Sequence, residues 1–84
     1  MTIEKKVKDL IENALTEKDF KLMQVTYTKE NGLNFLRIVI DREDPVNLDD
    51  CVAATKIVNH ILDKEDIIDE QYILDVCSYE RGGK

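Results

Sequence analysis

Apolar residues near the start of the chain recur with a period of about 3.6 residues and then with a period of two. The first pattern predicts an amphipathic helix from Thr2 to about Leu15, with Thr2 as its N-cap. The second predicts a β-strand from Phe20 to Lys29. On this strand we expect one side to carry Met23, Val25 and Tyr27 and the other Leu22, Gln24, Thr26 and Thr28.

A β-hairpin follows, because Asn31-Gly32 separates the first strand from a second alternating run, from about Asn34 to Asp41. Asn and Gly tolerate the positive φ angles that tight hairpin turns require. Asp44-Pro45 ends the second strand, since proline cannot donate a hydrogen bond to a neighbouring strand.

A second helix is predicted from about Leu48 to Leu62, with Asn47 as N-cap and Asp49 and Asp50 in the first turn. Its expected buried stripe is Leu48, Cys51, Val52, Thr55, Val58 and Leu62, widened by Ala54 and Ile61. Asp63 to Asp66 is interpreted as a polar exit from this helix, and a third strand is predicted from Tyr72 to Ser78.

The element order α-β-β-α-β indicates a two-layer α+β fold, with a three-stranded sheet and both helices on one face. The covered face should hold Met23, Val25, Tyr27, Leu36, Ile38, Ile40, Leu74 and Val76. The strand–helix–strand connection should be right-handed. The sequence leaves open which hairpin strand pairs with the third strand. Residues 1–78 are expected to form the domain and residues 79–84 a flexible tail.

Length and charge narrow the possible functions. The chain has 84 residues, which is enough for one small domain, and a net charge of −6 from 18 acidic and 12 basic residues. An acidic surface repels nucleic acid and attracts basic proteins. No stretch approaches the roughly 20 apolar residues of a membrane span, and no signal peptide is visible. We therefore expect a cytoplasmic protein in which Cys51 and Cys77 stay reduced.

The sequence contains no constellation of residues that predicts catalysis. His60 is the only histidine and should lie on the solvent side of the second helix. The acidic run around Asp41 to Asp44 and Asp49-Asp50 could attract Ca²⁺ or Mg²⁺, but its spacing fails the EF-hand pattern. We therefore expect no enzymatic activity, cofactor, metal or small-molecule substrate.

The sheet face opposite the helices should be mixed in character. Phe35, Val39, Ile73 and Cys77 could form a partly apolar patch, beside an ion pair of Arg37 with Asp41 or Asp75. Such a face is either an ordinary solvated sheet or a docking surface for a partner or a second domain, and the sequence leaves both interpretations open.

Several segments together resemble a known family. Leu22–Tyr27 is followed by Phe35–Asp41, then Val46–Cys51 (VNLDDC), Ile61–Asp63 (ILD) and finally Gln71–Val76 (QYILDV). In this order and at these spacings they are similar to the N-terminal domain of the bacterial ribosome maturation factor RimP family. The resemblance extends from Ile3 to Ser78.

The resemblance implies a non-enzymatic assembly factor that joins the immature small (30S) ribosomal subunit and leaves it before translation. It implies an acidic domain that binds a basic ribosomal protein. The residues that match the family are Arg37, Asp41, Asp49, Asp50 and Cys51. We expect Asp41, Asp49 and Asp50 to meet a basic partner, and Arg37, Val39 and Ile73 to form a second contact on the open sheet face. The alternatives are a small RNA-binding module and a single-domain relative that acts in protein interaction.

The chain departs from the family after the third strand. The family continues with a Ser-Pro-Gly-x-x-Arg-Pro-Leu segment and an SH3-like barrel, whereas here Ser78 is followed by Tyr79-Glu80-Arg81-Gly82-Gly83-Lys84. An excised domain and a natural single-domain relative both fit this ending.

Overall fold

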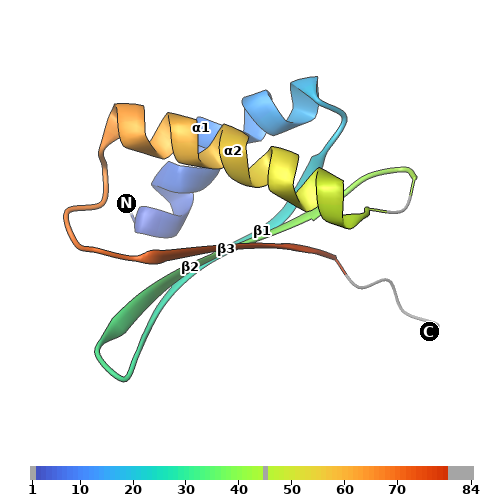
Figure 1. Cartoon of the computed structure of the whole chain (residues 1–84). Coiled ribbons are helices and arrows are strands. Elements are labelled where there is room, and N and C mark those ends of the chain that lie inside the picture. Colours follow the sequence, from blue (N-terminus) through green and yellow to red (C-terminus); the bar gives the residue numbers. More distant parts are fainter. Residues whose placement is uncertain (1, 45, 80–84) are drawn as a thin grey trace.

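A computed structural model describes residues 2–44 and 46–79 and shows two helices stacked on one side of a three-stranded sheet (Figure 1). The predicted α+β fold and its element order are confirmed. The elements in chain order are α1 (Ile3–Glu17), β1 (Lys21–Glu30), β2 (Leu33–Asp41), α2 (Leu48–Glu65) and β3 (Ile73–Ser78).

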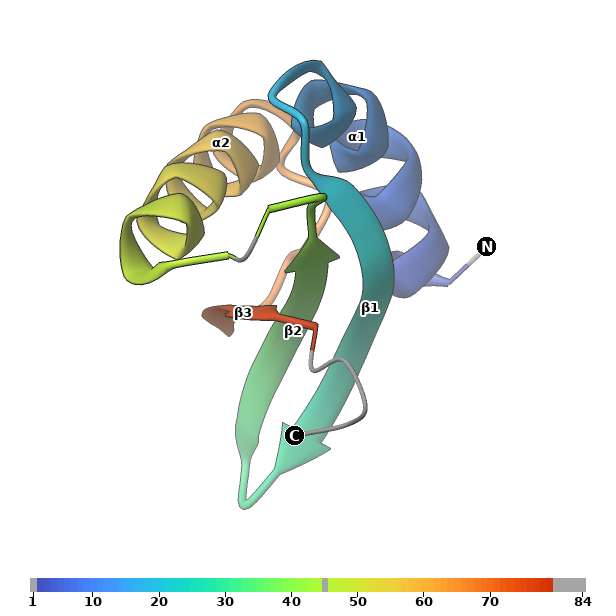
Figure 2. The ribbon, with the colours of Figure 1, turned by 90° about the vertical axis from the view of Figure 1, so that its right-hand side faces the viewer.

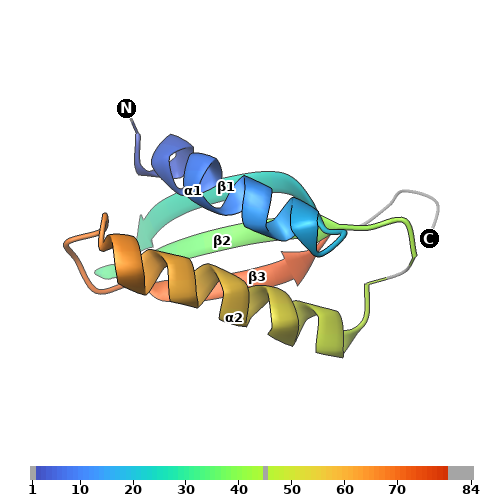
Figure 3. The same cartoon turned by 90° about the horizontal axis from the view of Figure 1, so that it is seen from above.

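The structure resolves the strand order as β1-β2-β3. β2 lies in the centre, antiparallel to β1 and parallel to β3. Seen from above the helices, α1 runs along the β1 side of the sheet and α2 along the β3 side (Figure 3). The side view shows both helices above the same face, while the opposite face of the hairpin has no helix over it (Figure 2). The handedness of the β2–α2–β3 connection stays a prediction.

The hydrophobic core lies between this face and the helices, and it is centred on β2. Its fully enclosed side chains come from α1, β2 and α2 and are Val7, Ile11, Leu15, Leu36, Ile38, Ile40, Ala54 and Val58. Because β2 has neighbours on both edges and helices above it, its alternate residues are removed from water completely. The strand's period of two therefore translates directly into burial.

A β-bulge in β1 overturns the prediction for two residues. The pairing with β2 shifts between Leu22 and Gln24, so that Leu22 pairs with Ile40 and Gln24 with Val39. The extra residue, Met23, leaves the covered face, and 43% of its surface is exposed. Leu22 packs against the core in its place. A bulge inserts one residue and so reverses the alternation on one side of it, which a strict period of two misses.

The predicted stripe of α2 was also wrong at two positions. Leu48 is 79% exposed and Val52 is 47% exposed, whereas Ala54, Val58 and Leu62 are buried. Successive residues turn by about 100° around a helix, so Val52 lies roughly 200° away from Ala54. The buried stripe is therefore Ala54, Val58 and Leu62 with Ile57 and Ile61 at its margins.

The helix ends follow the expected capping chemistry. The side chain of Thr2 accepts a hydrogen bond from the Lys5 amide, and Asn47 caps α2. The polar residues after Leu62 continue α2 to Glu65, and Asp66 ends it with a φ of 48°. Of the predicted tail, Tyr79 is described and its amide donates to the Ile40 carbonyl, 2.7 Å away. The remaining tail residues, 80–84, lie outside the described residues.

Candidate functional site

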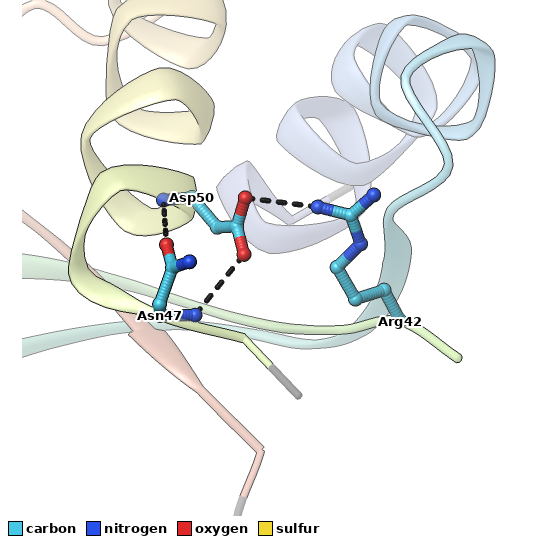
Figure 4. A network of polar contacts seen from close by, with 3 residues as sticks. All are labelled: Arg42, Asn47 and Asp50. Carbon is cyan, nitrogen blue, oxygen red and sulfur yellow. Dashed lines mark hydrogen bonds and ion pairs between the residues drawn. The ribbon is translucent and has the colours of Figure 1, made fainter. Parts of the chain in front are cut away.

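A polar network holds the start of α2 against the end of β2 (Figure 4). Asn47 Oδ1 accepts from the Asp50 amide at 2.9 Å, and Asp50 Oδ2 accepts from the Asn47 amide at 3.0 Å. These reciprocal bonds form a capping box, which satisfies amides that the first helical turn leaves unpaired. The other oxygen of Asp50 accepts from Arg42 Nη1 at 2.8 Å.

Arg42 extends this network to the start of β1. Its guanidinium carbon lies 5.2 Å from the centre of the Phe20 ring, a cation–π distance. The Arg42 and Asp50 side chains are 25% and 19% exposed, so water screens their ion pair less than it would on an open surface. Asp50, one of the acids expected to meet a partner, is thus engaged within the domain.

The exposed residues around this network form a surface that we call the α2-start surface, consisting of Glu43, Asp44, Leu48, Asp49 and Val52. All five side chains are exposed. Leu48 and Val52 are neighbours on α2 because they are four residues apart. Asp49 lies beside Leu48 in the first turn, and Glu43 and Asp44 precede the helix. The arrangement is an apolar pair on α2 with one exposed acid beside it in the first turn and two exposed acids in the segment that precedes the helix.

A hollow of about 530 Å³ continues this surface toward α1. It lies between the loop after α1 and the loop after β2, and its lining includes Asp19, Phe20, Arg42, Glu43 and Asp44. Asp41, the other acid expected to meet a partner, ends β2 opposite Lys21 and is partly buried. Of the three predicted acids, the structure therefore leaves Asp49 the most open to a partner.

The open sheet face carries the second predicted group of residues. Arg37 Nε donates to Asp75 Oδ2 at 3.2 Å, which selects Asp75 from the two expected partners. Along β2, Phe35 precedes this pair and Val39 follows it. The neighbours on β3 are Ile73 beside Phe35 and Cys77 beside Val39. The face thus alternates an apolar pair, an ion pair and a second apolar pair.

This face is shallowly concave. A hollow of about 480 Å³ is lined by Phe35, Arg37, Val39 and Cys77, together with Gln24, Thr26, Thr28, Glu30 and Ser78. Ile73 is exposed and Val39 is partly buried. Arg37, Val39 and Ile73 thus lie on one surface, on the opposite side of the sheet from the core and separate from the α2-start surface.

Within residues 2–44 and 46–79, three side chains have pKa values raised by their surroundings. Partial burial raises the pKa of the Cys77 thiol, and the Asp75 carboxylate adds to the effect while Arg37 opposes it. Burial also raises the pKa of Tyr27, with the Glu70 carboxylate adding to the effect, and that of Tyr72, with Asp63 and Asp66 adding to it. Each shift favours the neutral form, so Cys77 is a protonated and weakly nucleophilic thiol at neutral pH.

The described residues contain no group of three or more His, Cys, Asp or Glu side chains arranged to hold a metal ion. Both cysteines are free, and His60 is exposed on α2 as expected. The α2-start surface and the open sheet face offer hydrogen bonds, charge and apolar contact.

Sequence reasoning missed the exposed pair Leu48 and Val52, because it assigned both to the buried stripe of α2. One signal was available: assigning the stripe to Ala54, Val58 and Leu62 leaves Val52 on the opposite side of the helix. The link from Arg42 to Asp50 had no comparable signal, since it depends on how the loop between Asp41 and Asn47 folds.

Neither helix among residues 2–44 and 46–79 has the length and apolar character that a membrane crossing requires.

Comparison with known families agrees with this architecture. The family model of the RimP N-terminal domain matches residues 10–79, which include β1, β2, α2, β3 and the C-terminal half of α1. The chain therefore belongs to the RimP N-terminal domain family, a family of ribosome maturation factors that act in assembly of the 30S subunit.

Proposed function

We propose that this domain is a non-catalytic maturation factor domain that binds the immature 30S subunit in the cytoplasm by contacting a basic ribosomal protein. The α2-start surface makes the primary contact. The observation that carries the proposal is the exposure of Leu48 and Val52 among acidic side chains. Membership of the ribosome maturation factor family supports the choice of the immature 30S subunit as the binding target.

The chemistry of this surface matches a basic segment with apolar residues. Leu48 and Val52 would bury apolar area against the partner, and Glu43, Asp44 and Asp49 would pair with Lys or Arg around it. Burying apolar area contributes roughly 25 cal/mol per Å², so two such side chains can supply useful affinity. Charges at the rim mainly steer the encounter and select basic partners.

Asp50 supports this surface from within the domain, and Asp41, at the end of β2, is the third acid expected to meet the partner. Because Asp50 fixes Arg42 and the cap of α2, it holds Leu48 and Asp49 in place. The open sheet face forms a second contact through Arg37, Val39 and Ile73. Its central ion pair is satisfied within the domain, so a partner can cover it without supplying a charge.

Co-sedimentation with purified immature and mature 30S subunits tests the proposal. The informative variants are Leu48→Ser and Asp49→Lys, and the matched control is Asp63→Lys, which reverses an exposed acid elsewhere on α2. We expect both α2-start variants to weaken binding to immature subunits at least about fivefold, the control to change it little, and circular dichroism spectra to stay unchanged. Wild-type binding by both variants would refute this assignment of the surface.

Naked ribosomal RNA in a salt series separates this proposal from direct RNA binding. A protein that neutralises phosphates loses affinity steeply as salt rises, because counterions are released. We expect weak binding to naked RNA, insensitive to Asp49→Lys. Tight, salt-sensitive binding that Asp49→Lys strengthens would favour an RNA-binding module instead.

A further inference from the structure

The exposed edge of β1 differs in charge from the rest of the molecule. Residues 2–29 carry six lysines against five acids, whereas residues 30–84 carry six basic residues against 13 acids. The net negative charge therefore lies on the other elements. Lys5 and Lys8 are exposed on α1 beside this edge.

A groove separates α1 from β1. It has a volume of about 380 Å³ and is lined by Thr2, Glu4, Lys5 and Lys8 from the α1 side and Leu22, Met23, Gln24 and Val25 from β1. Met23 stands exposed at the bulge, and Leu22 and Val25 are partly buried. The groove thus has apolar side chains along the strand and, along the helix, the ammonium groups of Lys5 and Lys8 beside the Glu4 carboxylate, which accepts a hydrogen bond from the Tyr27 amide.

The backbone of β1 is available for pairing in this groove. Among the described residues, β1 has a partner strand on one side only. The Tyr27 amide donates to Glu4 Oε2 at 2.8 Å, so it points away from β2. Backbone groups alternate toward and away from the partner along an antiparallel strand, so the amide and carbonyl groups of Val25 also point outward.

The bond to Glu4 shows that an outward amide of this edge can donate a hydrogen bond to an oxygen atom outside the sheet. The Glu4 carboxylate occupies the position at which the carbonyl of an added strand would accept a hydrogen bond from the Tyr27 amide. One outward amide is therefore satisfied within the domain, while the stretch around Val25 lies open to the groove. A groove between an edge strand and a helix packed across it is a common architecture for strand addition.

We propose that this groove binds an extended, acidic segment of a partner protein, which adds to β1 as a fourth strand beside Met23 to Val25. The segment donates to and accepts from the outward backbone groups of Val25. Its carboxylates point toward α1 and pair with Lys5 and Lys8, and its alternate apolar side chains lie on the other face of the sheet and contact Met23. The site is separate from the α2-start surface. It selects an acidic partner, whereas the α2-start surface selects a basic one.

A synthetic peptide tests the proposal with the 84-residue chain. The probe is acetyl-Val-Glu-Val-Glu-Val-Glu-amide carrying a fluorophore, and the comparison peptides replace Glu by Lys or methylate the backbone nitrogens. We expect the acidic peptide to bind in anisotropy measurements at low salt, and bound peptide to slow hydrogen exchange of the Val25 amide at least tenfold. The N-methylated and lysine peptides should bind at least about fivefold more weakly, because they lose strand pairing and charge complementarity respectively.

Paired variants then locate the site. Lys5→Glu with Lys8→Glu should weaken binding of the acidic peptide at least about fivefold, whereas the matched control Lys18→Glu with Lys56→Glu should leave it unchanged. The proposal is overturned if the acidic peptide does not bind at millimolar concentration, or if N-methylation has no effect. Amide changes confined to the open sheet face, or displacement of the peptide by an equal concentration of oligouridine, would also overturn it.

Discussion

Replacing Asp50 by alanine should destabilise the domain far more than replacing its neighbour Asp49. Asp50 accepts a 2.8 Å hydrogen bond from Arg42 and a 3.0 Å bond from the Asn47 amide. Asp49 occupies the same helical turn with an exposed side chain. Both substitutions remove one negative charge and install the same residue, so the comparison isolates the network from the general effects of charge and helix propensity.

The magnitude follows from the contacts that are lost. Losing the helix-dipole interaction costs about 0.5 kcal/mol in either variant. Asp50→Ala also loses the bond to the Asn47 amide, worth about 0.5–1 kcal/mol, and the charge-assisted bond to a largely buried Arg42, worth about 1–1.5 kcal/mol. The free energy of unfolding should therefore fall by about 2–3 kcal/mol for Asp50→Ala, which corresponds to roughly 10–20 °C in Tm for a domain of this size.

Urea unfolding followed by circular dichroism measures both variants. The free energies of unfolding of Asp50→Ala and Asp49→Ala should differ by about 2 kcal/mol. A double-mutant cycle with Arg42→Ala should return a coupling of about 1 kcal/mol between Arg42 and Asp50. A difference below about 0.5 kcal/mol would show that the capping network does not anchor α2, and the positioning role assigned to Asp50 would fail with it.

Three further experiments test other parts of the structure. Ile38→Ala, in the fully buried centre of β2, should lower the free energy of unfolding by about 2–5 kcal/mol in urea, and a loss below 1 kcal/mol would contradict its packing. Asp66→Gly should raise it by about 1 kcal/mol, because Asp66 ends α2 in the left-handed region; no gain would argue against strain there. In Cys51→Ser protein, Cys77 should be alkylated more slowly at pH 8 than an unstructured thiol, since its pKa is raised. Adding Arg37→Ala should slow the alkylation further, because it removes the cation that lowers this pKa. Faster alkylation in either case would contradict the assigned direction of the pKa shifts.

Local patterns predicted the elements of this fold well. The caps Thr2 and Asn47 and the Asn31-Gly32 turn all occupy the predicted positions, because each depends on backbone chemistry within a few residues. The core residues of β2 were also predicted correctly, since a central strand covered by helices has an unambiguous inner side.

The candidate site was predicted less completely. Asp49 is exposed and Arg37, Val39 and Ile73 share one sheet face as expected, while their contact with a partner stays a prediction. The pairing of Arg37 with Asp75 depends on β3 lying beside β2. The exposure of Leu48 and Val52 was missed, because both were assigned to the side of α2 that faces the core. The internal engagement of Asp50 was missed because its partner Arg42 is supplied by a loop.

The sequence by itself determined the helices, the hairpin, the acidic character and the family resemblance, because periodicity, capping, turn chemistry and charge are local or additive properties. Only the tertiary structure decided the strand order, the reversal of Leu22 and Met23 at the bulge, and the exposure of Leu48 and Val52. These depend on which surfaces meet when the layers pack. A side chain is buried by what lies opposite it, and that neighbour comes from a distant part of the chain.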